Sequence, residues 1–142
     1  MTMNEKRQIK YPNTDYFQFS NLNPKGNITG DCVIRAICKA TGLNWEEAFM
    51  VMCKSALEVH DMPNCRLGEE AGLKKLGFVK GGSLKPEKGE HWPIVADMAR
   101  VHKKDIILCN CVGHIVCCMN GKFYDTWDSG SYTVRSYWIL NK

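Results

Sequence analysis

The chain has 142 residues, of which 44% are hydrophobic and 24% are charged. This length and composition are typical of one globular domain built around one core, and they exclude an intrinsically disordered chain. The net charge of +4 is small, and the Lys and Arg residues are spread along the chain without a cluster. We therefore expect no nucleic-acid partner.

The distribution of apolar residues disfavours membrane and secreted proteins. No apolar run approaches the roughly 20 residues of a membrane-spanning helix, and the polar N-terminus lacks the apolar segment of a secretory signal. We expect a cytoplasmic protein without a membrane partner. In a reducing cytoplasm the eight cysteines should be free thiols, several of them packed as small hydrophobic residues.

The N-terminal part of the chain carries few apolar residues. Residues 1–22 are polar and rich in Asn, and we interpret them as an extended lead-in with a short strand near residues 16–19. Apolar residues then recur at helical spacing and predict a first helix over residues 31–41. Gly42 is a natural stop for this helix, because glycine readily adopts the left-handed conformation found there.

Capping signals predict where the next helices begin. Asn44 and Glu47 have the spacing of a capping box and indicate a second helix with a continuous apolar stripe. After a break, Asn64 is expected to cap a third helix that ends near Gly77. A short strand, a loop and a short fourth helix are expected at residues 78–79, at residues 80–91 and after Pro93.

The final third of the chain changes to the pattern of β-strands. The Asn120-Gly121 dipeptide predicts a tight hairpin turn. Helices followed by an antiparallel sheet predict an α+β fold, with an N-terminal helical lobe packed on a C-terminal antiparallel β-sheet lobe in one domain over residues 1–142. The expected strands cover residues 105–111, 113–119, 122–126 and 132–140.

One cysteine stands at the predicted start of a helix. The sequence Gly30-Asp31-Cys32 places a thiol where helix N–H groups favour negative charge, and hence the thiolate. The same N–H groups could bind an oxyanion during acyl transfer. Asp31 opposes this interpretation, because a neighbouring carboxylate disfavours a thiolate, unless Asp31 caps the helix. From this segment alone, a buried small residue is the simpler interpretation of Cys32.

One of the four histidines begins a predicted strand. With the Asn-Gly dipeptide as the turn, His114 lies opposite Trp127, and Asp125 is its diagonal neighbour on the same face. A carboxylate in that position could accept the imidazole N–H. A bulge near the strand end would exchange Asp125 for Asp128, so both carboxylates remain candidates.

Taken together, these segments resemble the papain-like cysteine peptidases. In that family a Cys heads a helix, a His begins a strand of the opposing lobe, and an Asn or Asp follows on the next strand. Asp125-Thr126-Trp127 is similar to the family's Asn-Ser-Trp sequence, and residues 30–36 are similar to the nucleophile segment of the bacteriocin-processing peptidases. The pattern also looks like small phage and Firmicute proteins with these segments, and it covers about residues 23–140.

The resemblance implies a Cys-His-Asp triad that acts on peptide or protein substrates without a cofactor or metal. Cys32 would attack a carbonyl carbon and form a thioester, His114 would transfer the proton, and Asp125 would orient the imidazole. Trp127 would shield the His–Asp contact from water. The family's oxyanion Gln has no counterpart, and Asn27 is the nearest amide, one residue out of step. A peptidase, an isopeptidase, an amidase and a transferase all fit this triad.

Two other functions remain open. The chain could be a papain-like binding module with weak or lost catalysis, because a fold does not imply a function. It could also bind zinc, although structural zinc prefers Cys-x-x-Cys segments in loops rather than strand residues. The candidate zinc ligands are Cys109, Cys111, His114 and Cys117 or Cys118.

Overall fold

A computed structural model describes residues 1–141 and shows a mixed α and β fold. The helices of the described residues are α1 (Met3–Lys10), α2 (Cys32–Thr41), α3 (Trp45–Glu58), α4 (Arg66–Lys75) and α5 (Val95–Val101). The strands are β1 (Phe17–Phe19), β2 (Phe78–Lys80), β3 (Ile107–Cys111), β4 (His114–Met119), β5 (Lys122–Asp125) and β6 (Ser136–Leu140).

The six strands form a mixed sheet rather than an antiparallel one. Their order is β1-β5-β4-β3-β6-β2, and β1 runs parallel to β5 while the other neighbouring pairs are antiparallel. The expectation of a purely antiparallel C-terminal sheet was wrong, because β1 and β2 come from earlier in the chain and form its two edges. Strands of three residues show too little alternation to reveal a pairing partner from sequence.

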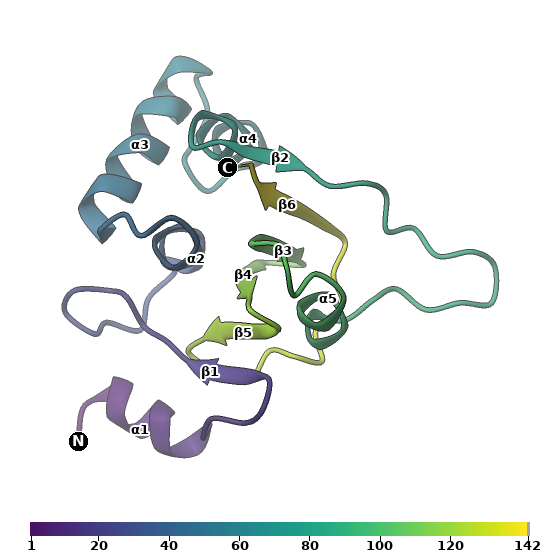
Figure 1. Ribbon diagram of the computed structural model, residues 1–142. Helices are drawn as coiled ribbons and strands as arrows, with labels where there is room; N and C mark the ends of the chain where they lie inside the picture. The colour runs from purple at the N-terminus through teal and green to yellow at the C-terminus, as the bar shows by residue number, and fades with distance from the viewer. Residues whose placement is uncertain (142) are drawn as a thin grey trace.

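Both faces of the sheet are covered by helices (Figure 1). Leu108 on β3 packs in a core with α2, α3 and α4, whereas its neighbours Ile107 and Cys109 pack in a second core with α5. Burial on both faces explains why β3 and β4 are almost continuously apolar in sequence. The helices therefore divide between the two faces of the sheet and do not form one lobe beside it.

The predicted lead-in contains a helix, α1, that the sequence interpretation missed. The Glu5 N–H donates to Thr2 Oγ1, and the Thr2 N–H donates to Glu5 Oε2, both at 3.1 Å. This capping box stabilises the first turn. No residue of α1 is buried, so the helix lacks the apolar stripe by which helices are usually recognised. It lies beside the β1 edge of the sheet (Figure 1).

The predicted hairpin between β4 and β5 is confirmed. Asn120 and Gly121 both have positive φ values, 55° and 76°, as a two-residue turn of this kind requires. Met119 pairs with Lys122 across the turn, which is the expected register. The hairpin therefore carries His114, at the start of β4, toward the end of β5.

The boundaries of the central helices agree with the capping signals in two of three cases. The Asn44 capping box begins α3, and Gly42 ends α2 in the left-handed conformation. Asn64 does not cap α4, because Cys65 is the residue before its first turn, and its side chain makes no capping hydrogen bond. Asn64 instead lines a cavity described below.

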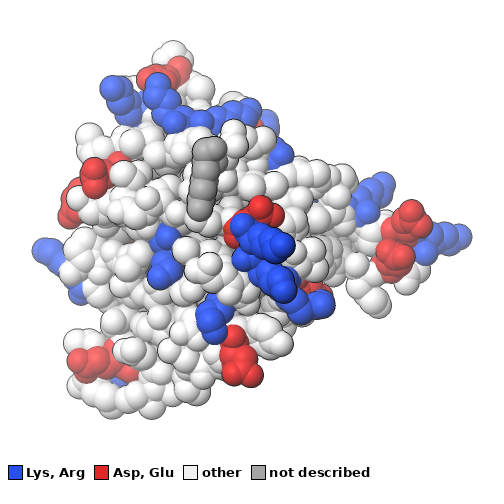
Figure 2. Space-filling model, in the orientation of Figure 1, with Lys and Arg blue, Asp and Glu red and all other residues white. Residues whose placement is uncertain are grey.

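Charged side chains of both signs are interspersed over the face shown in Figure 2, and no continuous basic stripe is visible there. The loop between β2 and α5 projects from the body of the protein (Figure 1) and carries exposed residues of both charges. Within residues 1–141, no helix combines the length and the apolar character needed to cross a membrane.

Candidate active site

Helix packing brings the Cys32 thiol to the start of β4. Cys32 is the first residue of α2, and His114 is the first residue of β4. Ile34 and Ile37 of α2 share a core with Ile115 of β4, so the helix lies along this strand. The apolar face of α2 therefore joins a thiol and an imidazole that are far apart in sequence.

His114 is hydrogen-bonded to Asp125 at the end of β5. The His114 Nε2 atom lies 2.6 Å from Asp125 Oδ2, and the two side chains are only 5% and 1% exposed. Because Nε2 faces the carboxylate, Nδ1 is the ring nitrogen that remains for Cys32. Asp128, the alternative carboxylate, is exposed and accepts the Gly130 N–H at 3.1 Å. The structure thus brings Asp125, and not Asp128, to His114.

Three further donors fix the orientation of the Asp125 carboxylate. The Ser129 hydroxyl donates to Oδ2 at 2.6 Å, and the Thr126 N–H donates to Oδ1 at 2.8 Å. Arg35 Nη1 also donates to Oδ1, at 3.4 Å. With four buried contacts, the carboxylate cannot rotate without losing hydrogen bonds that water would not replace.

Arg35 connects this carboxylate to a second one, that of Asp31. Arg35 Nε donates to Asp31 Oδ1 at 2.8 Å, and Asp31 Oδ2 accepts hydrogen bonds from Asn23 Nδ2 and Trp45 Nε1, both at 3.0 Å. Burial acts to raise the pKa of Asp31, but these hydrogen bonds and the charge of Arg35 outweigh it, and the pKa is lowered. Asp31 therefore stays ionised inside the protein.

This arrangement removes the objection that Asp31 raised against a thiolate at Cys32. Its carboxylate forms an ion pair with Arg35 and is buried, and it makes no capping hydrogen bond although Asp31 is the N-cap residue of α2. The Arg35 N–H, which bonds the Asp31 carbonyl at 2.9 Å, is the first within the helix. The N–H groups of the first turn, beginning with Cys32, are therefore left without a side-chain cap.

The pKa values of Cys32 and His114 are displaced in opposite directions. Burial raises the pKa of the Cys32 thiol, but His114, the Ile115 backbone N–H and the charge of Arg35 outweigh it, and the pKa is lowered. Burial likewise lowers the pKa of His114, but Asp125 and Cys32 outweigh it and raise the pKa to about 9. Together these shifts favour a thiolate beside an imidazolium near neutral pH.

Trp127 covers the contact between His114 and Asp125. Its ring centroid lies 4.2 Å from that of His114, with the planes tilted by 33°. On its outer side, the Arg7 guanidinium of α1 lies 5.6 Å from the Trp127 ring centroid, and Arg7 Nη1 donates to Thr126 Oγ1 at 3.4 Å. The helix that the sequence interpretation missed therefore supports the cover of the site.

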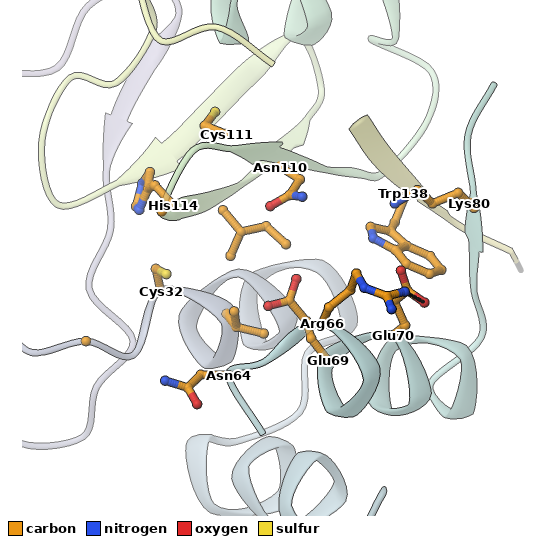
Figure 3. A pocket seen from close by; sticks show the side chains of 14 residues that line it. Cys32, Asn64, Arg66, Glu69, Glu70, Lys80, Asn110, Cys111, His114 and Trp138 are labelled. Atoms are coloured by element: carbon orange, nitrogen blue, oxygen red, sulfur yellow. Dashed lines mark ion pairs between the residues drawn. The ribbon is translucent and has the colours of Figure 1, made fainter. Parts of the chain in front are cut away.

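A cavity of about 530 Å³ opens beside Cys32 and His114. Figure 3 shows these two side chains facing each other at one end, with Trp138 and Lys80 at the other end. Side chains of α4 line the space between, among them Glu69. A second cavity of about 240 Å³ has Trp45 and Phe49 of α3 in its walls. It adjoins the first cavity, since Gly30 and Val33 line both.

The structure does not bring Asn27 to this cavity. Asn27 is exposed, and its hydrogen bonds use the backbone: its N–H donates to Asn23 Oδ1 at 3.3 Å, and its carbonyl accepts from Asn21 Nδ2 at 3.1 Å. The amide side chains that line the cavity belong to Asn64 and Asn110.

The cysteines considered as zinc ligands lie on both faces of the sheet. Cys117 packs in the core with α2, whereas Cys109, Cys111 and Cys118 pack in the core with α5. The Cys109 and Cys118 sulfurs lie 3.7 Å apart, and all eight cysteines are free. Among residues 1–141, no three His, Cys, Asp or Glu side chains are grouped as ligands of a metal ion.

The sequence interpretation missed the residues that support the Cys-His-Asp group. Asp31 and Arg35 have i,i+4 spacing at a helix start, and this signal could have predicted their ion pair. That Arg35 also reaches Asp125, 90 positions later in the chain, depends on tertiary packing alone. The same holds for Ser129, which no local pattern connects to His114.

Comparisons with known proteins provide no relative for this site. No family model matches the chain, and no match was found among the curated proteins or the solved structures. The chemistry of the site is therefore argued from its geometry.

Proposed function

We propose that this protein is a cysteine peptidase, or a related thiol-dependent amide hydrolase or acyl transferase, that acts on peptide or protein substrates. Cys32 is the nucleophile, His114 is the general base and acid, and Asp125 orients the imidazole. The observation that carries this proposal is the 2.6 Å contact between His114 and Asp125 together with the opposite pKa shifts of Cys32 and His114.

The proposed reaction proceeds through a thioester. The Cys32 sulfur forms a bond with the substrate carbonyl carbon, the C–N bond breaks, and the amine leaves with the proton from His114 Nδ1. A water molecule then gives a proton to His114 as its oxygen attacks the thioester carbon. The C–S bond breaks, the acid product leaves, and the thiolate beside the imidazolium is restored.

The oxyanion of the tetrahedral intermediate needs N–H donors. The first turn of α2 supplies them, because its N–H groups have no side-chain cap and lie next to the reactive sulfur. The positive end of the helix dipole adds to this stabilisation. No role is left for Asn27, which lies outside the cavity.

Two glycines give an extended substrate room to approach. Gly30, two residues before Cys32, and Gly113, the residue before His114, both line the cavity. A Cβ atom added to either residue would have no neighbour within 4 Å, so the space beside the backbone is open there. This supports a peptide chain as the substrate rather than a small enclosed molecule.

The arrangement also supports membership in the papain-like group as part of this proposal. The order Cys, His, Asp along the chain, with the thiol on a helix and the other two residues on neighbouring strands, is the order of that group. The ring of Trp127 over the His–Asp contact is a second point of similarity.

Selective alkylation tests the proposal. The native protein is treated with iodoacetamide or E-64 at neutral pH, and the modified cysteines are identified by mass spectrometry. Cys32 should react much faster than the other seven cysteines, and Cys32→Ser should abolish this fast phase while Cys65→Ser, at an exposed thiol, should not. A Cys32 that reacts no faster than free cysteine would refute the proposal.

The alternative is a papain-like binding module with weak or lost catalysis. It is favoured because the Asn27 side-chain amide does not line the cavity and so cannot donate to an oxyanion there. It predicts that a peptide bound in the cavity protects Cys32 from alkylation without being cleaved or acylating the thiol. Cleavage of an unactivated peptide by the native protein but not by Cys32→Ser, detected by mass spectrometry, would exclude this alternative. Measurement of bound zinc in the native protein tests the remaining zinc hypothesis.

A further inference from the structure

The cavity beside Cys32 contains a carboxylate that forms no ion pair with another residue of the described chain. Glu69 lies in the N-terminal part of α4, is partly buried and lines the cavity. Figure 3 shows its carboxylate directed into the cavity, between Cys32 and the far end. Among residues 1–141, no ion pair or side-chain hydrogen bond involves this carboxylate.

The other charged groups at that end of the cavity are engaged elsewhere. Arg66 Nη1 lies 3.9 Å from Glu70 Oε2. Lys80 Nζ lies 4.8 Å from the Trp138 ring centroid and donates to a serine hydroxyl at 3.3 Å. Among residues 1–141, neither cation forms an ion pair with Glu69, and of the two only the more distant charge of Lys80 acts on its carboxylate.

The electrostatics of Glu69 agree with this description. Burial raises the pKa of the Glu69 carboxyl, and Glu70 adds to the rise, while the charge of Lys80 opposes it only in part. Burial disfavours the charged form of such a carboxyl group, and a cation in contact with it stabilises the carboxylate. Because Glu69 lines the same cavity as Cys32 and His114, a substrate bound in this cavity can supply that cation.

We propose, on the basis of the peptidase function above, that Glu69 is a specificity-determining residue that selects substrates with a cationic group next to the bond under attack. An ammonium or guanidinium group would form a charge-assisted hydrogen bond with Glu69 in a partly desolvated site. An acidic group in the same position would be repelled. The cation is the side chain of a Lys or Arg residue or the α-amino group of the substrate.

Matched peptidyl probes test this selection. Acetyl-capped tripeptide acyloxymethyl ketones, which alkylate an active-site thiolate, carry Lys, norleucine or Glu at each position in turn. An uncapped norleucine peptide tests the α-amino group separately. The rate of Cys32 modification is measured by mass spectrometry, and iodoacetamide, which has no peptide part, reports the reactivity of the thiol alone.

We expect the native protein to react roughly tenfold faster with the Lys probe than with the norleucine probe at one position. Glu69→Gln should bring this ratio close to one, with the probe rates of each variant divided by its own iodoacetamide rate, and Glu69→Asp, which keeps the charge, should retain part of the preference. Glu87→Gln is the control and should leave the ratio intact, because Glu87 is exposed in the loop between β2 and α5 and does not line the cavity. A preference shown only by the uncapped peptide would identify the α-amino group as the cation.

Two outcomes separate this inference from the function on which it rests. If iodoacetamide modifies Cys32 rapidly but no cationic probe is preferred, or if Glu69→Gln keeps the preference, then selection by Glu69 is wrong and the peptidase proposal stands. If iodoacetamide modifies Cys32 no faster than free cysteine, then the peptidase proposal itself is wrong, and the inference is rejected with it.

Discussion

Arg35 lies between the carboxylates of Asp31 and Asp125, and the side chains are 10%, 5% and 1% exposed, respectively. Because one cation lies between two anions, the charge of Asp125 is only partly balanced by Arg35, and Asp125 can still stabilise a positively charged His114. In a buried group of this kind, removal of one partner usually destabilises the protein more than the pair stabilises it, because an unpaired charge stays behind. Arg35 is therefore a positioning residue that couples the start of α2 to the imidazole.

Asp31→Asn is predicted to lower the free energy of unfolding by about 3 kcal/mol at neutral pH. The pKa of Asp31 is lower in the folded state than in the unfolded state. Its contribution is therefore fully present above the unfolded value of about 3.9 and is lost as the pH falls through the lower, folded value. Urea denaturation of both proteins at several pH values should show the difference shrinking toward acid.

The matched control for this substitution is Asp97→Asn. Asp97 forms an ion pair with Arg100 at 3.4 Å, but these side chains are 50% and 64% exposed. An exposed pair contributes at most about 0.5 kcal/mol in most proteins. An equal effect of the two substitutions would contradict the role assigned to the buried group.

The reaction of Cys32 with iodoacetamide is predicted to have an unusual pH dependence. A free cysteine reacts as its thiol ionises near pH 8.5, whereas the lowered pKa of Cys32 should extend fast alkylation well below that pH. Under the proposed mechanism, substrate turnover also needs the imidazolium proton, so turnover should fall as the pH rises through about 9, the pKa of His114. Rates of alkylation and turnover across the pH range provide the measurement.

Asp125→Asn should move this profile toward that of an ordinary thiol. Loss of the carboxylate lowers the pKa of His114 and weakens the ion pair, and each unit by which the Cys32 pKa rises reduces the thiolate fraction at acid pH about tenfold. Asp128→Asn should leave the profile unchanged, because Asp128 faces solvent and the turn that follows β5. If the two substitutions had the same effect, the assignment of Asp125 would be wrong.

At the scale of elements, the sequence was most informative where a local rule and a tertiary contact agree. The Asn-Gly turn sets the register of β4 and β5, and this register is enough to place Asp125 near His114. The parallel pairing of β1 with β5 and the exposed helix α1 could not be foreseen, because neither carries a periodic apolar pattern. The contacts of Arg35 and Ser129 depend on how these elements pack, and no local pattern specifies them.

The close packing of α4 on the loop that precedes it leads to a prediction for Gly68. A Cβ atom at this position would lie 2.2 Å from the Met62 carbonyl oxygen, a backbone atom that cannot move aside as a flexible side chain would. Gly68→Ala should lower the free energy of unfolding by about 2–4 kcal/mol. Gly82→Ala is the control, since nothing lies within 4 Å of its added Cβ, and denaturation of both variants in urea checks the difference.

At the scale of the whole molecule, the two cores divide the cysteines into reactive and protected groups. Cys65 is exposed, Cys32 and Cys53 are partly buried, and the other five are buried. Burial also raises the pKa of Cys38 to about 11 and those of Cys111 and Cys117 to about 12. The buried thiols are therefore predicted to be inert in the native protein.

A count of labels tests this division. In the native protein a thiol reagent should label Cys32 first and then Cys53 and Cys65, while the five buried cysteines should react only as the chain unfolds globally. Mass spectrometry at increasing urea concentration should show the five masses appearing together at the unfolding midpoint. Labels that appear one at a time would show that the cores open separately.

The pairing of β1 with β5 also determines when a newly made chain can complete its fold. This pairing aligns Phe19 with Asp125. The N-terminal strand β1 therefore cannot pair until β5, about a hundred positions later in the chain, has been synthesised. Contacts of such long sequence separation form late in folding, and synthesis adds only about 5–20 residues per second. Until the C-terminal strands have left the ribosome, Cys32 lacks the contact with His114 that lowers the pKa of its thiol. Under the proposed function, the chain therefore acquires its reactive thiol only when synthesis is nearly complete.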